Sequence, residues 1–171
     1  MVPQLNEISY GRINRYWFWR LDYHLWEYRE CMGLNSVQQS VISKYVFREN
    51  RSIEHLHPQD ETNNDKWTRT SVDAFGNLAM ISQSFNSLQS NESVHFKFAR
   101  IEDQIKNGSL QSIKMYMMYL AARHNYEEWS EELSQKHGEL MYGFLVKCCE
   151  NNEVNPKLWE AINKGEDLEK N

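Results

Sequence analysis

The sequence predicts an α+β fold that is mostly helical, with one small ββα unit embedded among the helices. Apolar residues recur at helical spacing over most of the chain, whereas two short strand-like segments flank a long polar loop and precede a helix. The 171 residues, 40% of them hydrophobic, suffice for one domain with a core but not for two large ones. We therefore expect a single domain over residues 1–171.

An aromatic helix is expected first, over residues 13–30. Its apolar residues repeat at helical spacing, and further Trp and Tyr residues lie on its other faces, so it is apolar nearly all round. A small domain cannot easily bury such a helix on every side, so we expect it to contact an upstream domain or a second copy of the chain. The next segment is ambiguous: Ser36 could cap a helix, whereas residues 44–47 could form a short strand.

The ββα core is expected over about residues 50–106. Its segments are, in order, a strand at 52–56 that stops at Pro58, a polar loop at 59–71, a strand at 77–81 after Gly76, and helix from Ser84 onward that ends at Asn107-Gly108. Helices are also expected within 109–163: one over 110–123, one after Ser130 with two glutamates in its first turn, and a short one beginning at Asn155-Pro156.

Composition excludes several classes of protein. No apolar run approaches the roughly 20 residues needed to cross a membrane, and the N-terminus lacks an apolar signal core. An odd number of cysteines without metal-type spacing favours reduced thiols in the cytoplasm. The net charge is −5, and Lys44 to Lys106 contains eight Lys/Arg against nine Asp/Glu. We expect weak, salt-sensitive binding to nucleic acid.

Polar residues that could carry chemistry gather at the junctions of the predicted ββα unit. They occur in three segments: R-S-I-E-H-L-H-P-Q at 51–59, G-N-L at 76–78, and F-N-S-L at 85–88. Hydrolysis of a phosphodiester needs a base to activate water, a cation to stabilise developing charge, and a group that orients the base. These segments contain residue types suited to all three tasks.

His55 suits the base, because an unperturbed imidazole titrates near pH ~6.5. Glu54 and Asn86 offer the oxygen donors that Mg²⁺ or Mn²⁺ prefers. Asn77 could orient the imidazole through its amide or its backbone carbonyl, or could simply be a turn residue, and Asn86 could also cap a helix. Neighbours on a regular strand point to opposite faces, so Glu54 and His55 share a site only if the strand breaks there.

Nucleic-acid contacts are expected from Arg51, His57, Lys97 and Arg100. For each arginine and for Lys97, an exposed residue that aids solubility is nearly as good an interpretation. For His57 a solvent or loop role is favoured over a phosphate contact. A zinc site with His55 is disfavoured, because no Cys or third His follows at zinc spacing.

Taken together, these motifs resemble the HNH-type nuclease domain at the C-terminus of GmrSD-type, modification-dependent restriction enzymes. In HNH nucleases an acidic residue precedes the base histidine in a D/E-H-x-x-P pattern, which Glu54, His55 and Pro58 match. Asn77 matches the asparagine at the start of the second strand, and Asn86 matches the metal-binding residue nine positions later. Only about residues 50–90 are specific to the motif; a looser likeness extends over most of the chain.

The resemblance implies a metal-dependent DNA endonuclease with a ββα-metal (His-Me finger) unit, acting in defence against foreign or modified DNA. Larger members carry an N-terminal nucleotide-binding, ParB-like domain that nothing here matches, so we expect such a domain or subunit as a partner. Two alternatives stay open: an interaction or DNA-binding subunit of a split restriction system with little activity alone, and an RNA-directed toxin nuclease.

Overall fold

The structure, a computed structural model, describes residues 1–12, 15–50, 52–59, 67–84, 92–150 and 153–165. Its longer helices are α1 (Tyr16–Glu27), α2 (Ser36–Ser43), α5 (Val94–Asn107), α6 (Ile113–Ala121), α7 (Glu131–Cys149) and α8 (Pro156–Lys164). The shorter elements are strands β1 (Ser52–His55) and β2 (Leu78–Ile81), helix α3 (Arg69–Val72), and the 3-10 helices η1 (Leu5–Glu7), η2 (Phe75–Asn77) and η3 (Tyr126–Glu128). The described residues are thus mostly helical with one small sheet, as the α+β prediction requires.

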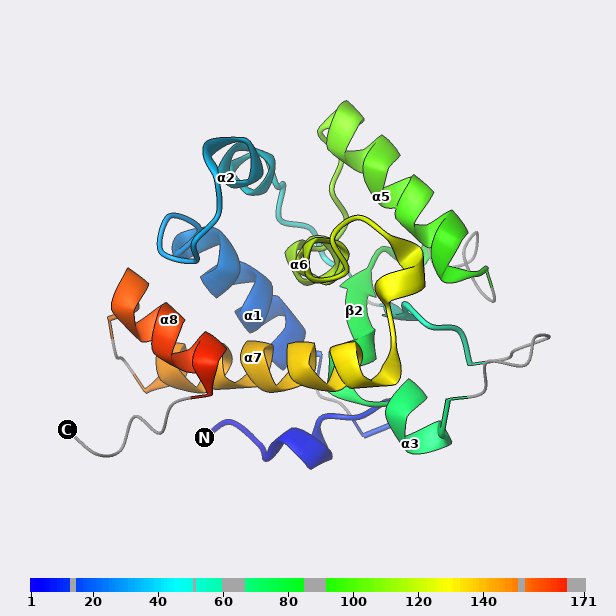
Figure 1. Cartoon of the computed structure of the whole chain (residues 1–171), viewed down its shortest axis with the longest axis horizontal. Helices are drawn as coiled ribbons and strands as arrows, with labels where there is room; N and C mark the ends of the chain where they lie inside the picture. The colour runs from blue at the N-terminus through cyan, green and yellow to red at the C-terminus, as the bar shows by residue number, and fades with distance from the viewer. Residues whose placement is uncertain (13–14, 51, 60–66, 85–91, 151–152, 166–171) are drawn as a thin grey trace.

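Helix α7 is the longest element and runs along one side of the molecule, with the N-terminal segment beside it (Figure 1). It packs against η2, α1, α6 and α8, whereas α5 packs against α6 and η3 (Figure 1). The two strands pair antiparallel, with Glu54 opposite Ala79 and His55 opposite Leu78. All four residues of β2 are buried, because α1 and α6 also pack against this strand.

The later helices begin where their capping residues predict. The side chains of Ser112, Ser130 and Asn155 accept hydrogen bonds from the first turns of α6, α7 and α8, and Pro156 follows as the first residue of α8. Gly108 ends α5 in a left-handed conformation that glycine adopts without strain. Polar side chains that satisfy free backbone groups therefore set these boundaries.

The N-terminal third differs in detail from the sequence prediction. Helix α1 buries Phe18, Leu21 and Leu25 on one side, whereas three aromatic residues on its other side are about 41–44% exposed, namely Tyr16, Trp19 and Tyr23. The ambiguous segment contains helix α2, and residues 44–47 form no strand. Asn35 caps this helix instead of Ser36, because Asn35 and Gln38 exchange two side-chain hydrogen bonds in a capping box.

Element η2 is fixed tightly between helices. A Cβ atom at Gly76 would lie 1.9 Å from the carbonyl oxygen of Ser134 in α7, and Gly138 of α7 faces Gly76 directly. From α6, the buried Lys114 Nζ donates to the carbonyl oxygens of Phe75 at 2.9 Å and Leu78 at 2.7 Å. This packing fixes the start of β2, and through it the position of β1. Among the described helices, none has the length and apolarity to cross a membrane.

Candidate functional site

The end of β1 places Glu54 and His55 side by side in the chain but against different neighbours. Glu54 reaches Lys97 of α5, whereas the His55 ring lies against Asp73 and Tyr10. This separation follows from the alternation of side chains along a strand. The Lys97 ammonium joins the two positions, because it contacts the Glu54 carboxylate and also donates to the His55 carbonyl oxygen.

Asp73 orients the His55 imidazole. Its Oδ1 lies 2.9 Å from His55 Nε2 and accepts a hydrogen bond from Gln59, while its Oδ2 accepts one from Arg69 at 2.8 Å. Burial alone would raise the pKa of Asp73, but the hydrogen bonds from Gln59, His55 and Arg69 lower it. The ionised carboxylate holds the proton of a neutral imidazole on Nε2, which leaves Nδ1 as the proton acceptor.

The environment of His55 favours its neutral form. Burial lowers the pKa of His55 below its ordinary value of 6.5, and the Asp73 carboxylate offsets this only in part. Tyr10 covers the ring edge-on, with ring centroids 4.5 Å apart. The segment that carries Tyr10 is held there by a hydrogen bond from its amide to the Asp73 carbonyl oxygen and by a β-bridge between Ser9 and Ala74.

Glu54 and Lys97 form a buried ion pair. Their side chains are 3% and 2% exposed, and Lys97 Nζ lies 2.5 Å from Glu54 Oε1. Burial raises the pKa of Glu54 and lowers that of Lys97, and the attraction between the two opposes both shifts. The prediction that Lys97 lies on the surface and contacts phosphate is therefore wrong for this structure. Because its ammonium is directed inward to Glu54 and the His55 carbonyl, it is not available to a phosphate.

The three other residues that were predicted to contact nucleic acid differ in exposure and partners. Arg100 is partly exposed and binds Glu92 through two nitrogen–oxygen contacts of 2.6 and 2.8 Å. His57 is 7% exposed and stacks on Trp67 with ring centroids 4.0 Å apart. Of the solvent or loop role expected for it, the solvent part is therefore wrong, whereas its position in the loop after β1 agrees with the other part. Arg51 lies outside the described residues.

Asn77 is fully buried and holds the segment that follows His55. Its Oδ1 accepts from the amide of His57 at 2.8 Å and from the Trp129 indole at 3.2 Å, and its Nδ2 donates to the carbonyl oxygens of His57 and Val72. Its backbone carbonyl accepts from the amide of Leu56. These contacts bind the backbone next to His55, so any effect of Asn77 on the imidazole passes through that backbone.

Of the two predicted metal ligands, Glu54 is described and Asn86 lies outside the described residues. The Glu54 carboxylate is a donor that suits Mg²⁺ or Mn²⁺, and Glu92 lies near enough to influence the pKa of both Glu54 and Lys97. Among the described residues, no three His, Cys, Asp or Glu side chains gather in a way that could hold a metal. The chemistry of Glu54 fits one position of a hard-cation site, with Lys97 in contact with it.

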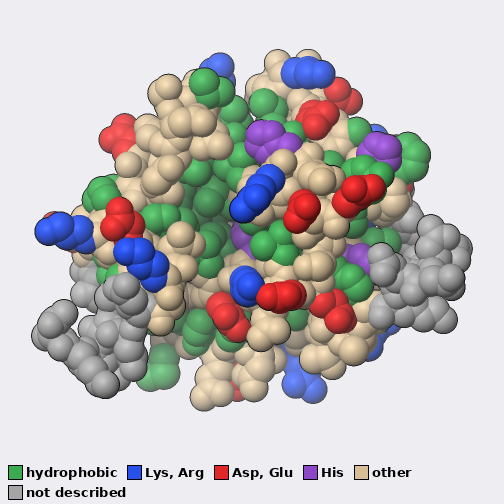
Figure 2. Space-filling view, viewed as in Figure 1, with side chains coloured by type: hydrophobic (Ala, Val, Ile, Leu, Met, Phe, Trp, Pro, Cys, Tyr) green, Lys and Arg blue, Asp and Glu red, His purple; other side chains and the backbone are tan. Residues whose placement is uncertain are grey.

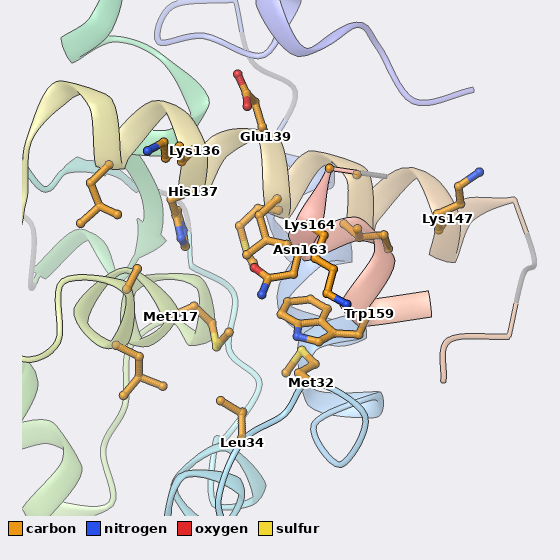
Figure 3. A pocket seen from close by; sticks show the side chains of 18 residues that line it. Met32, Leu34, Met117, Lys136, His137, Glu139, Lys147, Trp159, Asn163 and Lys164 are labelled. Carbon is orange, nitrogen blue, oxygen red and sulfur yellow. The ribbon is translucent and has the colours of Figure 1, made fainter. Parts of the chain in front are cut away.

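A large cavity lies elsewhere. It has a volume of about 1040 Å³, it is lined from α6, α7, α8 and the segment after α1, and none of the predicted site residues lines it. His137 points from α7 toward α6 and Met117, while Trp159 of α8 lies next to Met32 (Figure 3). Burial, with a smaller contribution from Lys114, lowers the pKa of His137 well below 6.5. This imidazole is thus a neutral group within the helical core.

Comparison with known protein families gives a match over most of the chain. Residues 4–144 match the model of the C-terminal domain of GmrSD restriction endonucleases. The chain belongs to this family. The match includes β1, β2, α5 and every residue that surrounds His55 and Glu54, whereas α8 and its wall of the large cavity lie beyond residue 144. Comparisons with curated proteins and with solved structures gave no match.

Membership of the GmrSD C-terminal family relates the chain to restriction endonucleases, and so to nuclease function on DNA. Sequence reasoning singled out Glu54, His55 and Asn77 from their motifs and included Gln59 in the segment at 51–59, but it missed Tyr10, Arg69 and Asp73 as neighbours of His55. Asp73 lies three residues before Gly76 without any spacing that marks it, and Tyr10 reaches the site only through tertiary contacts. Chain folding, and no local pattern, brings these three residues to the imidazole.

Proposed function

We propose that this GmrSD C-terminal domain is a metal-dependent DNA endonuclease of the HNH class, in which His55 activates the attacking water. The observation that carries the proposal is the contact between His55 Nε2 and the Asp73 carboxylate, which leaves Nδ1 to accept a proton. The lowered pKa of His55 keeps the ring neutral, as a general base requires. Arg69 and Gln59 keep the carboxylate in place, and Tyr10 limits movement of the ring.

Glu54 and Asn86 are the residues that would hold the cation, Mg²⁺ or Mn²⁺. When bound, such an ion stabilises negative charge on the phosphate and on the leaving oxygen. Glu54 lies next to His55 in β1, so the acid and the base are fixed by one short strand. Asn77 keeps the end of that strand in place through the backbone of His57.

We propose that arginines make the phosphate contacts. Arg69 is the best placed, because its side chain is 70% exposed while its Nε contacts Asp73, the partner of His55. Arg51 and Arg100 remain candidates from the sequence. An arginine can bind a phosphate oxygen and keep one hydrogen bond to a carboxylate, because its guanidinium has five donors.

Plasmid nicking tests the proposal. The full chain is incubated with supercoiled DNA in Mg²⁺, Mn²⁺ or EDTA, beside His55→Ala and a control variant, Lys136→Met, which removes an exposed ion pair with Glu132. We expect cleavage by the parent and by Lys136→Met that needs the metal, and loss of about 10²-fold or more in His55→Ala. Equal cleavage by the parent and His55→Ala would refute the role of His55. Faster cleavage of RNA than of DNA would favour the toxin-nuclease alternative.

A second candidate function is that of an interaction subunit in a split restriction system. The exposed aromatic side of α1 supports it, because Tyr16, Trp19 and Tyr23 remain on the surface together with Phe47. We propose that this side binds another copy of the chain or a nucleotide-binding, ParB-like domain or subunit. If the chain alone does not cut but does so when that partner is added, and Trp19→Ser abolishes the gain, the interaction role is primary. Robust cutting by the isolated chain contradicts it.

A further inference from the structure

The Lys97 side chain reaches from the first turn of α5 into the interior and ends on two oxygens of β1. Its Nζ lies 2.5 Å from Glu54 Oε1 and 2.5 Å from the His55 carbonyl oxygen. The Lys97 and Glu54 side chains are almost fully buried, so water screens the attraction between their charges little. A carboxylate and a backbone carbonyl are the two kinds of oxygen that a divalent hard cation also takes from proteins.

The charges around this pair are balanced. Glu92 influences both Glu54 and Lys97 electrostatically, and Arg100 binds Glu92 through two nitrogens. Two carboxylates therefore face two cationic side chains. A divalent cation that joined this group would meet Lys97 at close range, and two positive charges a few ångströms apart in a buried site repel strongly.

We propose that Lys97 is an internal counter-ion that occupies the cation's place on Glu54, so that Lys97 and a divalent metal compete for one carboxylate. Metal binding then requires the ammonium to leave Glu54. The inference rests on the proposed function in one respect, that Glu54 is a metal ligand. The inference adds two points: Lys97 neutralises the buried Glu54 carboxylate in the metal-free domain, and Lys97 thereby sets the affinity of the site for the metal.

Replacement of Lys97 by methionine tests the competition. Lys97→Met keeps an unbranched side chain of similar length and removes the charge, which leaves Glu54 buried without a partner. We expect Lys97→Met to melt at a lower temperature than the parent without metal, because an unpaired buried charge destabilises a protein. We also expect it to bind Mn²⁺ at least tenfold more tightly in calorimetric titration, with a larger rise in melting temperature on addition of Mn²⁺.

Two further variants separate the possible outcomes. The double variant Glu54→Gln with Lys97→Met should lose the gain in Mn²⁺ affinity, and Lys136→Met should bind Mn²⁺ like the parent. Equal affinity in Lys97→Met and the parent would overturn the competition, as would a gain that survives Glu54→Gln. If Glu54→Gln alone leaves Mn²⁺ binding unchanged, Glu54 is no ligand and the metal assignment of the proposed function fails as well. If Glu54→Gln abolishes binding while Lys97→Met gains nothing, only the present inference fails.

The unmodified chain supplies a second measurement if Lys97→Met does not fold. The NMR signals of the Lys97 Cε and Nζ atoms can be followed while Mg²⁺ is titrated into the parent. We expect these signals to shift with the same midpoint as the heat of Mg²⁺ binding, because the ammonium leaves Glu54 as the ion arrives. Lys97 signals that stay constant while Mg²⁺ binds would overturn the inference.

Discussion

Asp73 determines which nitrogen of His55 carries the proton of the neutral ring. Its carboxylate is ionised, since hydrogen bonds from three side chains lower its pKa, and it accepts from Nε2. A water molecule at Nδ1 would then meet a lone pair and not an N–H group. One carboxylate thereby controls both the tautomer and the orientation of the base.

Asp73→Asn should reduce cleavage by about 10²-fold, because an amide holds the imidazole less firmly and can stabilise the wrong tautomer. The pH profile distinguishes this role from a structural one. The rate requires neutral His55, so it is lost as pH falls through the folded-state pKa, which lies below 6.5. Asp73 raises that pKa against burial, so Asp73→Asn should move the acid limb to lower pH. Nicking rates measured between pH 5 and 8 check this. If Asp73→Asn loses activity at the same pH as the parent and keeps the same maximal rate, the role of Asp73 is contradicted.

Residue roles differ in how far the sequence reveals them. Glu54, His55 and Asn77 stand in motifs with characteristic spacing, so they could be singled out. The inward direction of Lys97 could not be predicted, because a lysine on an amphipathic helix is ordinarily solvated and its partner, Glu54, lies on a distant strand. Asp73 could not be predicted for a similar reason. It follows α3, and only the fold brings it to His55.

At the scale of elements, the close contact between η2 and α7 positions both strands. Gly76→Ala should therefore be strongly destabilising, because its Cβ would overlap the Ser134 carbonyl oxygen of α7. Overpacking against backbone costs about 3 kcal/mol in the free energy of unfolding, at the upper end of the usual range. Urea denaturation measures this cost. Gly143→Ala is the matched control, since its Cβ would meet only the Ile162 side chain, at 3.2 Å, and no carbonyl oxygen. An equal loss in both variants would refute the contact as the cause.

Element boundaries were predictable where a single polar residue decides them. Ser130 and Asn155 mark the starts of α7 and α8 because each satisfies backbone amides that the helix leaves free. At the start of α2 two good capping residues, Asn35 and Ser36, are adjacent in the sequence. Only the reciprocal hydrogen bonds between Asn35 and Gln38 select Asn35 as the cap. Helix α3 was missed within the predicted polar loop, because four residues are too few to show a helical period.

At the scale of the whole molecule, the distribution of charged side chains bears on DNA binding. Lysines and arginines lie among aspartates and glutamates on the face seen in Figure 2, where hydrophobic side chains line a hollow. With a net charge of −5, we expect general attraction to DNA to be weak, so that affinity would depend on a few local arginines.

Salt dependence tests this picture. If Arg51, Arg69 and Arg100 make the three proposed phosphate contacts, we expect a slope of about −3 for the logarithm of the binding constant against the logarithm of salt concentration. Fluorescence anisotropy measures the slope with His55→Ala, the variant that the proposed function expects to bind DNA without cutting it. Arg69→Gln should make it shallower by about 1, whereas Lys136→Met should leave it unchanged. A slope near zero, or one insensitive to Arg69→Gln, would contradict these contacts.

The pairing of Ser9 with Ala74 has a practical consequence for work with this protein. Because that bridge lays Tyr10 over the imidazole, removal of the first ten residues would uncover one side of the His55 ring. Reaction rates are therefore best compared on protein that keeps these residues.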